Sequence, residues 1–374
     1  MISRMTLQNI LSRVHKGKAL LLFGARQVGK TTLLKNMMDQ GGDSILHING
    51  DEPDIRDLLP KMTSGQLKNY IGKHSILIID EAQRISNIGL ILKLIVDQIE
   101  SVQVIATGSS SFEMANKMNE PLTGRKYEFK LFPLSFQEMV NHHGLIEEKR
   151  QLEQRLIYGA YPDVITHPTE SEELLNLITD SYLFKDILML DSIKRPLLLE
   201  KILKALALQV GSEVSYHEIA QLVGADKATV EKYIHLFEQT FVIFQLPSFS
   251  RNVRNELKKS KKYYFYDCGV RNAIIGNFSS VRNRTDIGAL WENYLISERM
   301  KKLSYEGKRQ QSYFWRTTQQ QEVDLVEEDV NDLKAFEFKW AQHVKVKFPK
   351  TFTRAYPNAS IDIITPENYE MFLM

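Results

Sequence analysis

The sequence has a single cysteine, Cys268, in 374 residues. One cysteine excludes a disulfide within the chain and any zinc site built from several cysteines. No apolar run reaches the roughly 20 residues that a membrane-spanning helix needs, and the first residues do not resemble a signal peptide. We therefore expect a cytoplasmic protein that makes no contact with a membrane.

Charge of one sign is also scarce, because 48 Lys and Arg residues oppose 46 Asp and Glu residues and leave a net charge of +2. Any attraction to nucleic acid must therefore come from local patches. The one basic run, RNVRNELKKSKK at 251–262, is either a solvated loop or a contact for phosphates. Internal repeats and low-complexity tracts are absent as well.

A chain of 374 residues is too long for one typical domain, and its 43% apolar content lets each domain bury a core. We expect three domains, at residues 1–145, 146–265 and 266–374.

Residues 19–34, ALLLFGARQVGKTTLL, join a buried-strand pattern to the start of a helix through Gly-x-x-x-x-Gly-Lys-Thr. This is the P-loop pattern in the strand–loop–helix setting that it requires. The glycines let backbone N–H groups wrap phosphate oxygens, the lysine carries charge to the β and γ phosphates, and the hydroxyl of Thr31 is offered to Mg²⁺. The residues expected to bind the nucleotide are Gly24, Ala25, Arg26, Gln27, Val28, Gly29, Lys30, Thr31 and Thr32.

A second strand-like run, SILIIDE at 75–81, ends in two acids. We expect Asp80 to hold Mg²⁺ through water and Glu81 to act as the catalytic group that polarises the attacking water. An Asp followed by a Glu favours ATP hydrolysis over nucleotide storage. Asp80 alone would also fit a strand-end cap, but the pair fits that role poorly.

Two later polar residues are candidates for the same site. Ser109 follows the apolar strand 102–107 and is a candidate sensor of the γ-phosphate. Arg125 precedes the next strand-like segment and is a candidate catalytic arginine that contacts the γ-phosphate, in cis or from a neighbouring subunit of a homo-oligomer. The alternative for Arg125 is an ordinary surface ion pair.

The segments GARQVGKTTLL, IIDEAQR, ATGSSSF and LTGRKYEFKLFPLSFQEM together resemble prokaryotic AAA+-superfamily ATPases that carry a C-terminal domain of uncharacterised function. GAYPDVI, YYFYDCGVRNAI, WENYLISE and EVDLV…FEFKW look like the same family and occur in the same order. The resemblance spans nearly the whole chain and implies ATP binding by the first domain. It implies little about the biological role.

The middle of the chain has the pattern of a winged helix. An apolar helical repeat covers 197–210, Ser215 is positioned to cap YHEIAQLV, and Asp226 is positioned to cap KATVEKYIHLFEQ before an apolar strand at 241–246. In a DNA-binding version the third helix would present Lys227, Thr229, Lys232 and His235. The alternative is a module that packs against other parts of the protein.

Six elements are expected near the end of the chain, in the order helix, three strands, helix, strand: 285–303, 311–316, 322–327, 334–340, 346–355 and 361–365. This is the order of the restriction-endonuclease-like fold. In that fold an acid on the second strand and an acid-x-lysine on the third form the catalytic centre. The residues in the corresponding positions are Asp324, Glu337 and Lys339, with Glu292 from the first helix as a fourth member.

Side chains alternate along a strand, so Glu337 and Lys339 share one face while Phe336 and Phe338 share the other. We expect Glu292, Asp324 and Glu337 to hold Mg²⁺ or Mn²⁺, and Glu337 and Lys339 to act in phosphodiester hydrolysis. Val323 stands where the family has proline, and Trp340 is bulky for an open site. The alternatives are a fold that binds nucleic acid without cutting it and an ordinary sheet with paired charges.

The predicted fold class is therefore α/β: a P-loop NTPase sheet, a winged-helix-like domain and a restriction-endonuclease-like domain. The predicted function is Mg²⁺-dependent ATP hydrolysis coupled to a nuclease-like domain that acts on or binds DNA. The alternative is an ATP-dependent switch or scaffold whose last domain binds protein or nucleic acid and has no catalytic activity. ATP and Mg²⁺ are the expected cofactors.

Overall fold

The computed structural model describes residues 2–40, 44–109, 121–183, 195–250, 261–308, 310–317, 319–330, 332–341 and 348–374. Most of the basic run, at 251–260, lies outside these ranges. The chain divides into two compact units, of which unit 1 is mainly Met1–Pro133 and unit 2 contains most of the remainder. Over the described ranges, no helix has both the length and the apolar character needed to cross a bilayer.

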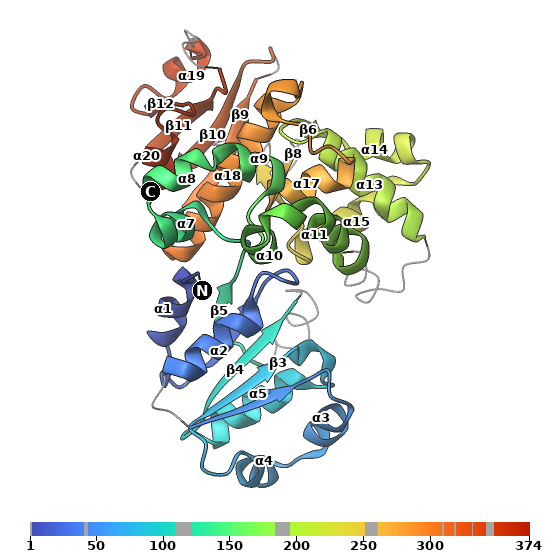
Figure 1. Cartoon of the computed structure of the whole chain (residues 1–374), viewed down its shortest axis with the longest axis vertical. Helices are drawn as coiled ribbons and strands as arrows, with labels where there is room; N and C mark the ends of the chain where they lie inside the picture. The colour runs from blue at the N-terminus through green and yellow to red at the C-terminus, as the bar shows by residue number, and fades with distance from the viewer. Residues whose placement is uncertain are drawn as a thin grey trace. The chain divides into compact units, whose positions relative to one another are not determined.

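Unit 1 is built on a parallel five-stranded sheet in the order β2-β3-β4-β1-β5. Figure 1 shows β3 and β4 side by side in this sheet. Its central strands are fully buried, as their unbroken apolar runs predict. The strands are β1 (Ala19–Phe23), β2 (Ile45–Asn49), β3 (Ile76–Asp80), β4 (Gln103–Gly108) and β5 (Lys126–Lys130). The α/β fold with a parallel sheet predicted for the first domain is confirmed.

After α1, which precedes the first strand, helices lie between β1 and β2, β2 and β3, and β3 and β4, as in α/β proteins. Helix α5 is strongly apolar and buries most of its first two turns, whereas α4 starts with a capping box between Thr63 and Gln66. The helices are α1 (Met5–Leu11), α2 (Lys30–Gln40), α3 (Pro53–Leu58), α4 (Ser64–Ile71) and α5 (Ile88–Gln98).

The boundary between the units lies at Pro133, earlier than the predicted residue 145. Helix α7 (Phe136–His143) belongs to unit 2 because its amino end is bonded there. The backbone N–H of Phe136 donates to the buried carboxylate of Glu298 at 2.6 Å, and Lys301 donates to the same carboxylate at 2.6 Å. Further short helices follow: α8 (Leu145–Arg150), α9 (Leu152–Tyr158), α10 (Pro162–Thr166) and α11 (Ser171–Leu177).

The middle segment of unit 2 has the predicted helices and caps. Ser215 accepts a hydrogen bond from the Glu218 N–H, and Asp226 accepts one from the Thr229 N–H at 2.8 Å. Three antiparallel strands pair in the order β6-β8-β7. The elements in chain order are α13 (Pro196–Leu208), β6 (Glu213–Val214), α14 (Tyr216–Val223), α15 (Lys227–Gln239), β7 (Ile243–Pro247) and β8 (Lys261–Phe265).

The C-terminal segment has the six predicted elements in the predicted order, with one further helix at the end of the chain. Its four-stranded sheet runs β12-β11-β10-β9, with β11 antiparallel to β10 and parallel to β12. The elements are α18 (Ile287–Tyr305), β9 (Gln311–Arg316), β10 (Glu322–Glu328), β11 (Leu333–Phe338), α19 (Lys350–Ala355), β12 (Ser360–Ile364) and α20 (Tyr369–Leu373).

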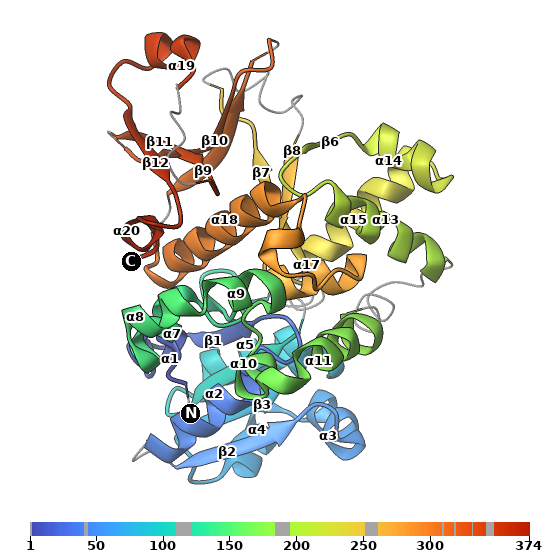
Figure 2. The ribbon, with the colours of Figure 1, turned by 45° about the horizontal axis from the view of Figure 1, so that its top comes forward.

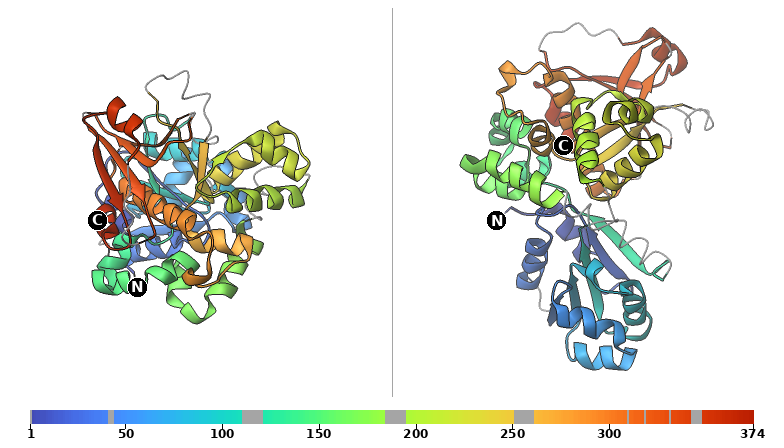
Figure 3. Two further views of the ribbon diagram at one scale, coloured as in Figure 1. Left: turned by 90° about the horizontal axis from the view of Figure 1, so that it is seen from above. Right: turned by 90° about the vertical axis from the view of Figure 1, so that its right-hand side faces the viewer.

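The middle and C-terminal segments fall in one unit, although separate domains were expected. The two sheets meet where Phe249 donates its N–H to the Phe314 carbonyl at 2.6 Å. Helix α18 packs against both β8 and β11, and Figure 2 shows it running beside the C-terminal sheet. In Figure 3 α17 (Cys268–Ile275) and α18 lie between that sheet and helices α13–α15. Shared packing around α18 therefore joins the segments.

Asp267 is a buried polar link within unit 2. It caps α17 by accepting the Val270 N–H at 3.0 Å, and its other oxygen accepts the Ala160 N–H at 2.7 Å. Burial raises the pKa of this carboxyl. Gly159 is required beside it, because a Cβ there would lie 2.0 Å from an Asp267 oxygen.

Replacing Asp267 with alanine leaves two buried N–H groups without acceptors, so we expect a loss of at least about 2 kcal/mol in unfolding free energy. Urea unfolding of the full chain measures this loss. Asp226→Ala removes an exposed helix cap of the same kind and should cost less. Equal losses for the two variants would contradict the importance of the buried link.

Candidate functional site

The P-loop connects β1 to α2 in unit 1. Gln27 and Gly29 have positive φ angles of 61° and 94°, which bend the loop back toward the start of the helix. At Gly24 the requirement is space, because a Cβ would lie 2.2 Å from the carbonyl oxygen of Leu131. Glycine at this position thus lets the loop pass close to the end of β5.

Lys30 is the buried first residue of α2, and its ammonium donates to the carbonyls of Gly24 and Ala25 at 2.8 Å each. The ammonium is therefore held by carbonyls of the P-loop itself. In this position it can bind phosphate oxygens in place of those carbonyls. The amino end of α2, with its outward backbone N–H groups, adds a site suited to an anion. The donor set therefore fits a nucleotide phosphate.

Arg4 braces the loop and was missed by sequence reasoning. Its guanidinium donates to the carbonyls of Val28 and Phe132 at 2.6 Å each and is largely buried. It thereby ties the P-loop to the segment after β5. The side chain of Val28 is buried in the core, whereas Thr31 and Thr32 are exposed on the first turn of α2.

The predicted magnesium ligands meet across the sheet. The Thr31 hydroxyl donates to a carboxylate oxygen of Asp80 at 2.8 Å, and the Thr107 hydroxyl donates to the other oxygen. Thr107 lies on β4, which pairs with β1 on one side and β3 on the other. The strand order thus brings Thr31 and Asp80 together, and Asp80 with Thr31 fits Mg²⁺, which prefers oxygen ligands.

Glu81 and Ser109 are bridged by Gln83, which sequence reasoning also missed. The Gln83 amide donates to Glu81 at 2.6 Å and to the Ser109 hydroxyl at 3.3 Å. Glu81 has a φ of 48°, a strained conformation for a residue with a side chain. Gly50 allows that turn, since a Cβ there would lie 2.5 Å from the Glu81 carbonyl. The two acids and the candidate sensor therefore form one connected group.

Arg125 lies at the opposite end of the strands from the P-loop, which corrects the cis alternative. Ala19 pairs with Lys126, so Arg125 lies beside the amino end of β1, whereas the P-loop follows its carboxyl end. Five residues of strand separate the two ends, about 16 Å at 3.3 Å per residue. The Arg125 guanidinium contacts Asp97 at 2.6 Å, which is the predicted surface ion pair. A contact from a neighbouring copy stays a prediction.

A second candidate site lies on β10 and β11 of unit 2. Lys339 donates to one oxygen of Glu337 at 2.6 Å, and the Phe338 N–H donates to Asp324 at 2.7 Å. The other oxygen of Glu337 is buried and has no hydrogen-bond partner among the described residues. Such an orphaned oxygen beside a second carboxylate fits a divalent cation held by Asp324 and Glu337.

The alternation of faces on β11 is as predicted. Phe336 and Phe338 pack on the ring of Phe372, with ring centroids 4.8 and 5.6 Å apart. Trp340 packs edge-on against Trp291 of α18 at 5.5 Å. The side chain of Trp340 is thus partly packed against α18.

Glu292 is engaged differently from the prediction. It accepts hydrogen bonds from the Lys262 ammonium at 3.0 Å and from the Tyr264 hydroxyl at 2.5 Å. Lys262 also donates to Glu322. Within the described ranges, no group of three or more His, Cys, Asp or Glu side chains has an arrangement that could hold a metal ion. The expected three-carboxylate metal site is therefore not formed, because a lysine takes up Glu292.

The electrostatics of this region follow from burial. Burial, then Glu292, then Glu337 raise the pKa of Asp324 well above its usual range. Burial alone would lower the pKa of Lys262, but Glu292, Glu322 and Asp324 outweigh it and raise the value. The pKa of Lys339 is also raised, since Glu337 and Asp324 outweigh its burial. The region therefore stabilises positive charge.

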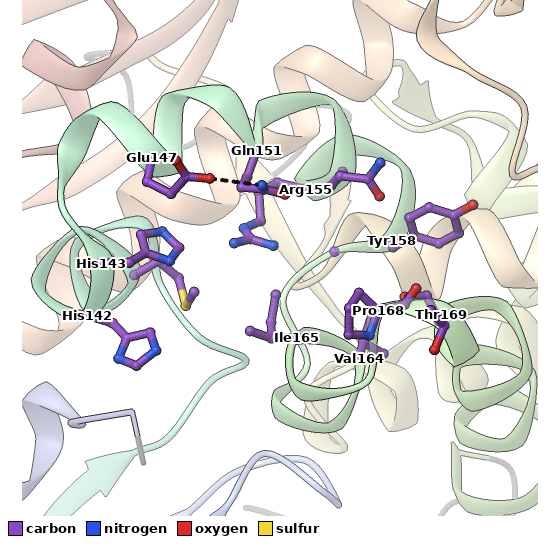
Figure 4. A pocket seen from close by; sticks show the side chains of 14 residues that line it. His142, His143, Glu147, Gln151, Arg155, Tyr158, Val164, Ile165, Pro168 and Thr169 are labelled. Carbon is purple, nitrogen blue, oxygen red and sulfur yellow. Dashed lines mark hydrogen bonds between the residues drawn. The ribbon is translucent and has the colours of Figure 1, made fainter.

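A pocket of about 500 Å³ lies among α7 to α11 (Figure 4). Its charged side chains bond to neighbouring protein groups. Figure 4 shows Glu147 paired with Gln151, while Arg155 donates twice to Glu148 at 2.9 Å and His143 contacts the same carboxylate. No sequence pattern pointed to this pocket, and its paired charges suggest no chemistry.

Comparison with known families covers most of the chain in three parts. Residues 16–140 match an AAA domain. Residues 149–281 and 287–370 match two domains of unknown function, DUF8612 and DUF4143. The first match supports an AAA-type ATPase domain, in agreement with the P-loop geometry.

The curated relatives of this chain include three uncharacterised proteins. An uncharacterised protein of Haemophilus influenzae is 27% identical over 68% of this chain and 69% of its own length. Uncharacterised proteins of Mycobacterium tuberculosis and Methanocaldococcus jannaschii are 23% and 24% identical, over 87% and 79% of this chain and 71% and 72% of their own lengths.

The solved structures similar to this chain include a Walker-type ATPase and a branch migration motor. A Walker-type ATPase of Pyrococcus abyssi has a TM-score of 0.49 at 15% identity and covers 73% of this chain and 96% of its own. The RuvB Holliday junction branch migration motor of Thermotoga maritima has a TM-score of 0.33 at 17% identity, over 69% and 95% of the two chains.

The close approach at Gly24 generates a prediction. Gly24→Ala should lower the unfolding free energy by about 1–3 kcal/mol, because the added methyl group overlaps the Leu131 carbonyl. Thermal unfolding followed by circular dichroism measures the change. Gly65→Ala in α4 is the control, since a Cβ there meets open space. Unchanged stability in Gly24→Ala would refute the packing role.

Proposed function

We propose that unit 1 binds ATP and hydrolyses it with Mg²⁺. The observation that carries the proposal is the hydrogen bond between Thr31 and Asp80, which brings the P-loop and the end of β3 into one site. The match of residues 16–140 to an AAA domain supports it independently. A P-loop joined to adjacent Asp and Glu residues is equipped to activate water.

Each residue has a distinct role in this proposal. Lys30 and the N–H groups at the start of α2 bind the β and γ phosphates, and Thr31 with Asp80 hold Mg²⁺. Bound Mg²⁺ supplies positive charge against the phosphate oxygens. Glu81 orients the attacking water and takes its proton, while Gln83 holds Glu81 in reach of Ser109.

The proposed role of Arg125 is a contact with the γ-phosphate of a neighbouring copy in a homo-oligomer. Its side chain is about two-fifths exposed, and its ion pair with Asp97 is at the surface. Such a pair contributes little stability and can be exchanged for a phosphate contact. Turnover would then depend on protein concentration.

The proposed hydrolysis is tested by steady-state phosphate release. Lys30→Ala should abolish nucleotide binding and turnover. Glu81→Gln should retain binding and lose roughly 10²-fold or more in rate, because the base is removed. Lys35→Ala, an exposed lysine on the same helix, is the matched control and should behave as the wild type. Full activity in Glu81→Gln would contradict the role of Glu81.

For the C-terminal segment we propose a restriction-endonuclease-like fold. Its support is the element order with antiparallel β9-β10-β11 and β12 parallel to β11, and the position of Asp324, Glu337 and Lys339 at one place in that sheet. Asp324 and Glu337 would hold one Mg²⁺, and Lys339 would stabilise charge on a phosphate. DNA is the proposed partner.

For the middle segment we propose a winged helix that packs against the nuclease-like segment. The order helix, strand, helix, helix, strand, strand and the sheet order β6-β8-β7 support this fold. The third helix, α15, exposes Lys227, Lys232 and His235 but also Glu231. This mixed surface favours the packing role over DNA reading.

The nuclease proposal predicts nicking of supercoiled plasmid in the presence of Mg²⁺ or Mn²⁺. Glu337→Gln should abolish nicking, because one of two metal-holding carboxylates is lost, whereas Glu328→Gln on β10 should nick normally. Uncut DNA in the wild type with either metal and with ATP would instead favour the switch or scaffold. In that case Glu337→Gln would leave partner binding intact.

A further inference from the structure

Lys262 is one of the largest fully buried side chains of the described chain, although it ends in a charge. Its side chain is 1% exposed and its ammonium donates to both Glu292 and Glu322. The ammonium also lies 5.4 Å from the centre of the Phe314 ring. Burying an ammonium is unfavourable unless carboxylates compensate it. These carboxylates therefore hold a cation that belongs to the protein.

The backbone fixes this cation in place. Lys262 is on β8, the central strand of its sheet, and pairs with Glu213 on one side and Leu246 on the other. A residue paired on both sides has little freedom to withdraw. Tyr264, two residues along the same face, donates to the Glu292 oxygen that Lys262 contacts.

The hydrogen-bond partners of Glu337 differ from those of Glu292 and Glu322. Lys339 takes one of its oxygens, and the other is buried without a hydrogen-bond partner among the described residues. Asp324 receives one backbone N–H bond. The carboxylates near this site thus form two pairs: Glu292 and Glu322 share the buried ammonium of Lys262, whereas the pair Asp324 and Glu337 includes a buried oxygen without a hydrogen-bond partner among the described residues.

We propose that Lys262 is a built-in cation that occupies Glu292 and Glu322 and so restricts the nuclease-like site to a single divalent ion at Asp324 and Glu337. This inference rests on the proposed nuclease-like fold. In this proposal Lys262 limits the number of metal ions that the site binds, and Glu292 is a partner of lysine instead of a metal ligand.

The test is a count of Mn²⁺ ions bound per full-length chain without nucleotide, measured by electron paramagnetic resonance. The wild type should bind one ion at the C-terminal site. Lys262→Gln should bind one more ion than the wild type, because Glu292 loses its cation and Glu322 keeps only the contact with Arg316 at 3.5 Å. Lys261→Gln removes the neighbouring lysine on β8 and should match the wild type. Equal counts in Lys262→Gln and the wild type would overturn the proposal.

A second variant keeps the inference testable if Lys262→Gln fails to fold. Glu292→Gln should leave the wild-type count unchanged, since Glu292 holds lysine. Loss of the ion in Glu292→Gln would overturn the proposal. Asp324→Asn should bind no Mn²⁺ ion at the C-terminal site. If this variant still binds the ion, the proposed metal site is wrong, whatever the role of Lys262.

Discussion

The position of β4 between β1 and β3 is the constraint on which the nucleotide site depends. With this order, the end of β4 lies between the P-loop and the two acids at the end of β3, Asp80 on the strand and Glu81 directly after it. Thr107 can then donate to Asp80 while Thr31 reaches the same carboxylate from α2. A β3 strand paired directly with β1 would place no β4 residue between these groups. The site is thus a consequence of sheet topology as much as of its motifs.

The motif residues could be predicted from the sequence because each motif is local. The P-loop lies within nine residues, 24–32, and the caps at Ser215 and Asp226 precede the helices that they start. The supporting residues could not be predicted in this way. Arg4 contacts a carbonyl 128 positions away, and Gln83 contacts a serine 26 positions away. Such contacts exist only once the strands are ordered.

In the C-terminal segment, too, a local pattern could be predicted from the sequence and a long-range contact could not. The period of two on β11 predicted which side chains share a face, and the phenylalanines pack as that period requires. The partner of Glu292 could not be foreseen, because Lys262 stands at the end of a basic run in which no lysine is distinguished by its neighbours. The pairing of β8 selects it. The burial of Lys262 and the strand pairing of β8 therefore make Glu292 part of an ion pair instead of a metal ligand.

The most direct measurement of the central claim is the equilibrium affinity of a fluorescent ATP analogue for the full chain with and without Mg²⁺. If Thr31 and Asp80 form one site with the P-loop, Mg²⁺ strengthens binding in the wild type, and Thr31→Ala removes that gain. Affinity that is independent of Mg²⁺, or a Mg²⁺ effect that survives Thr31→Ala, would contradict the account.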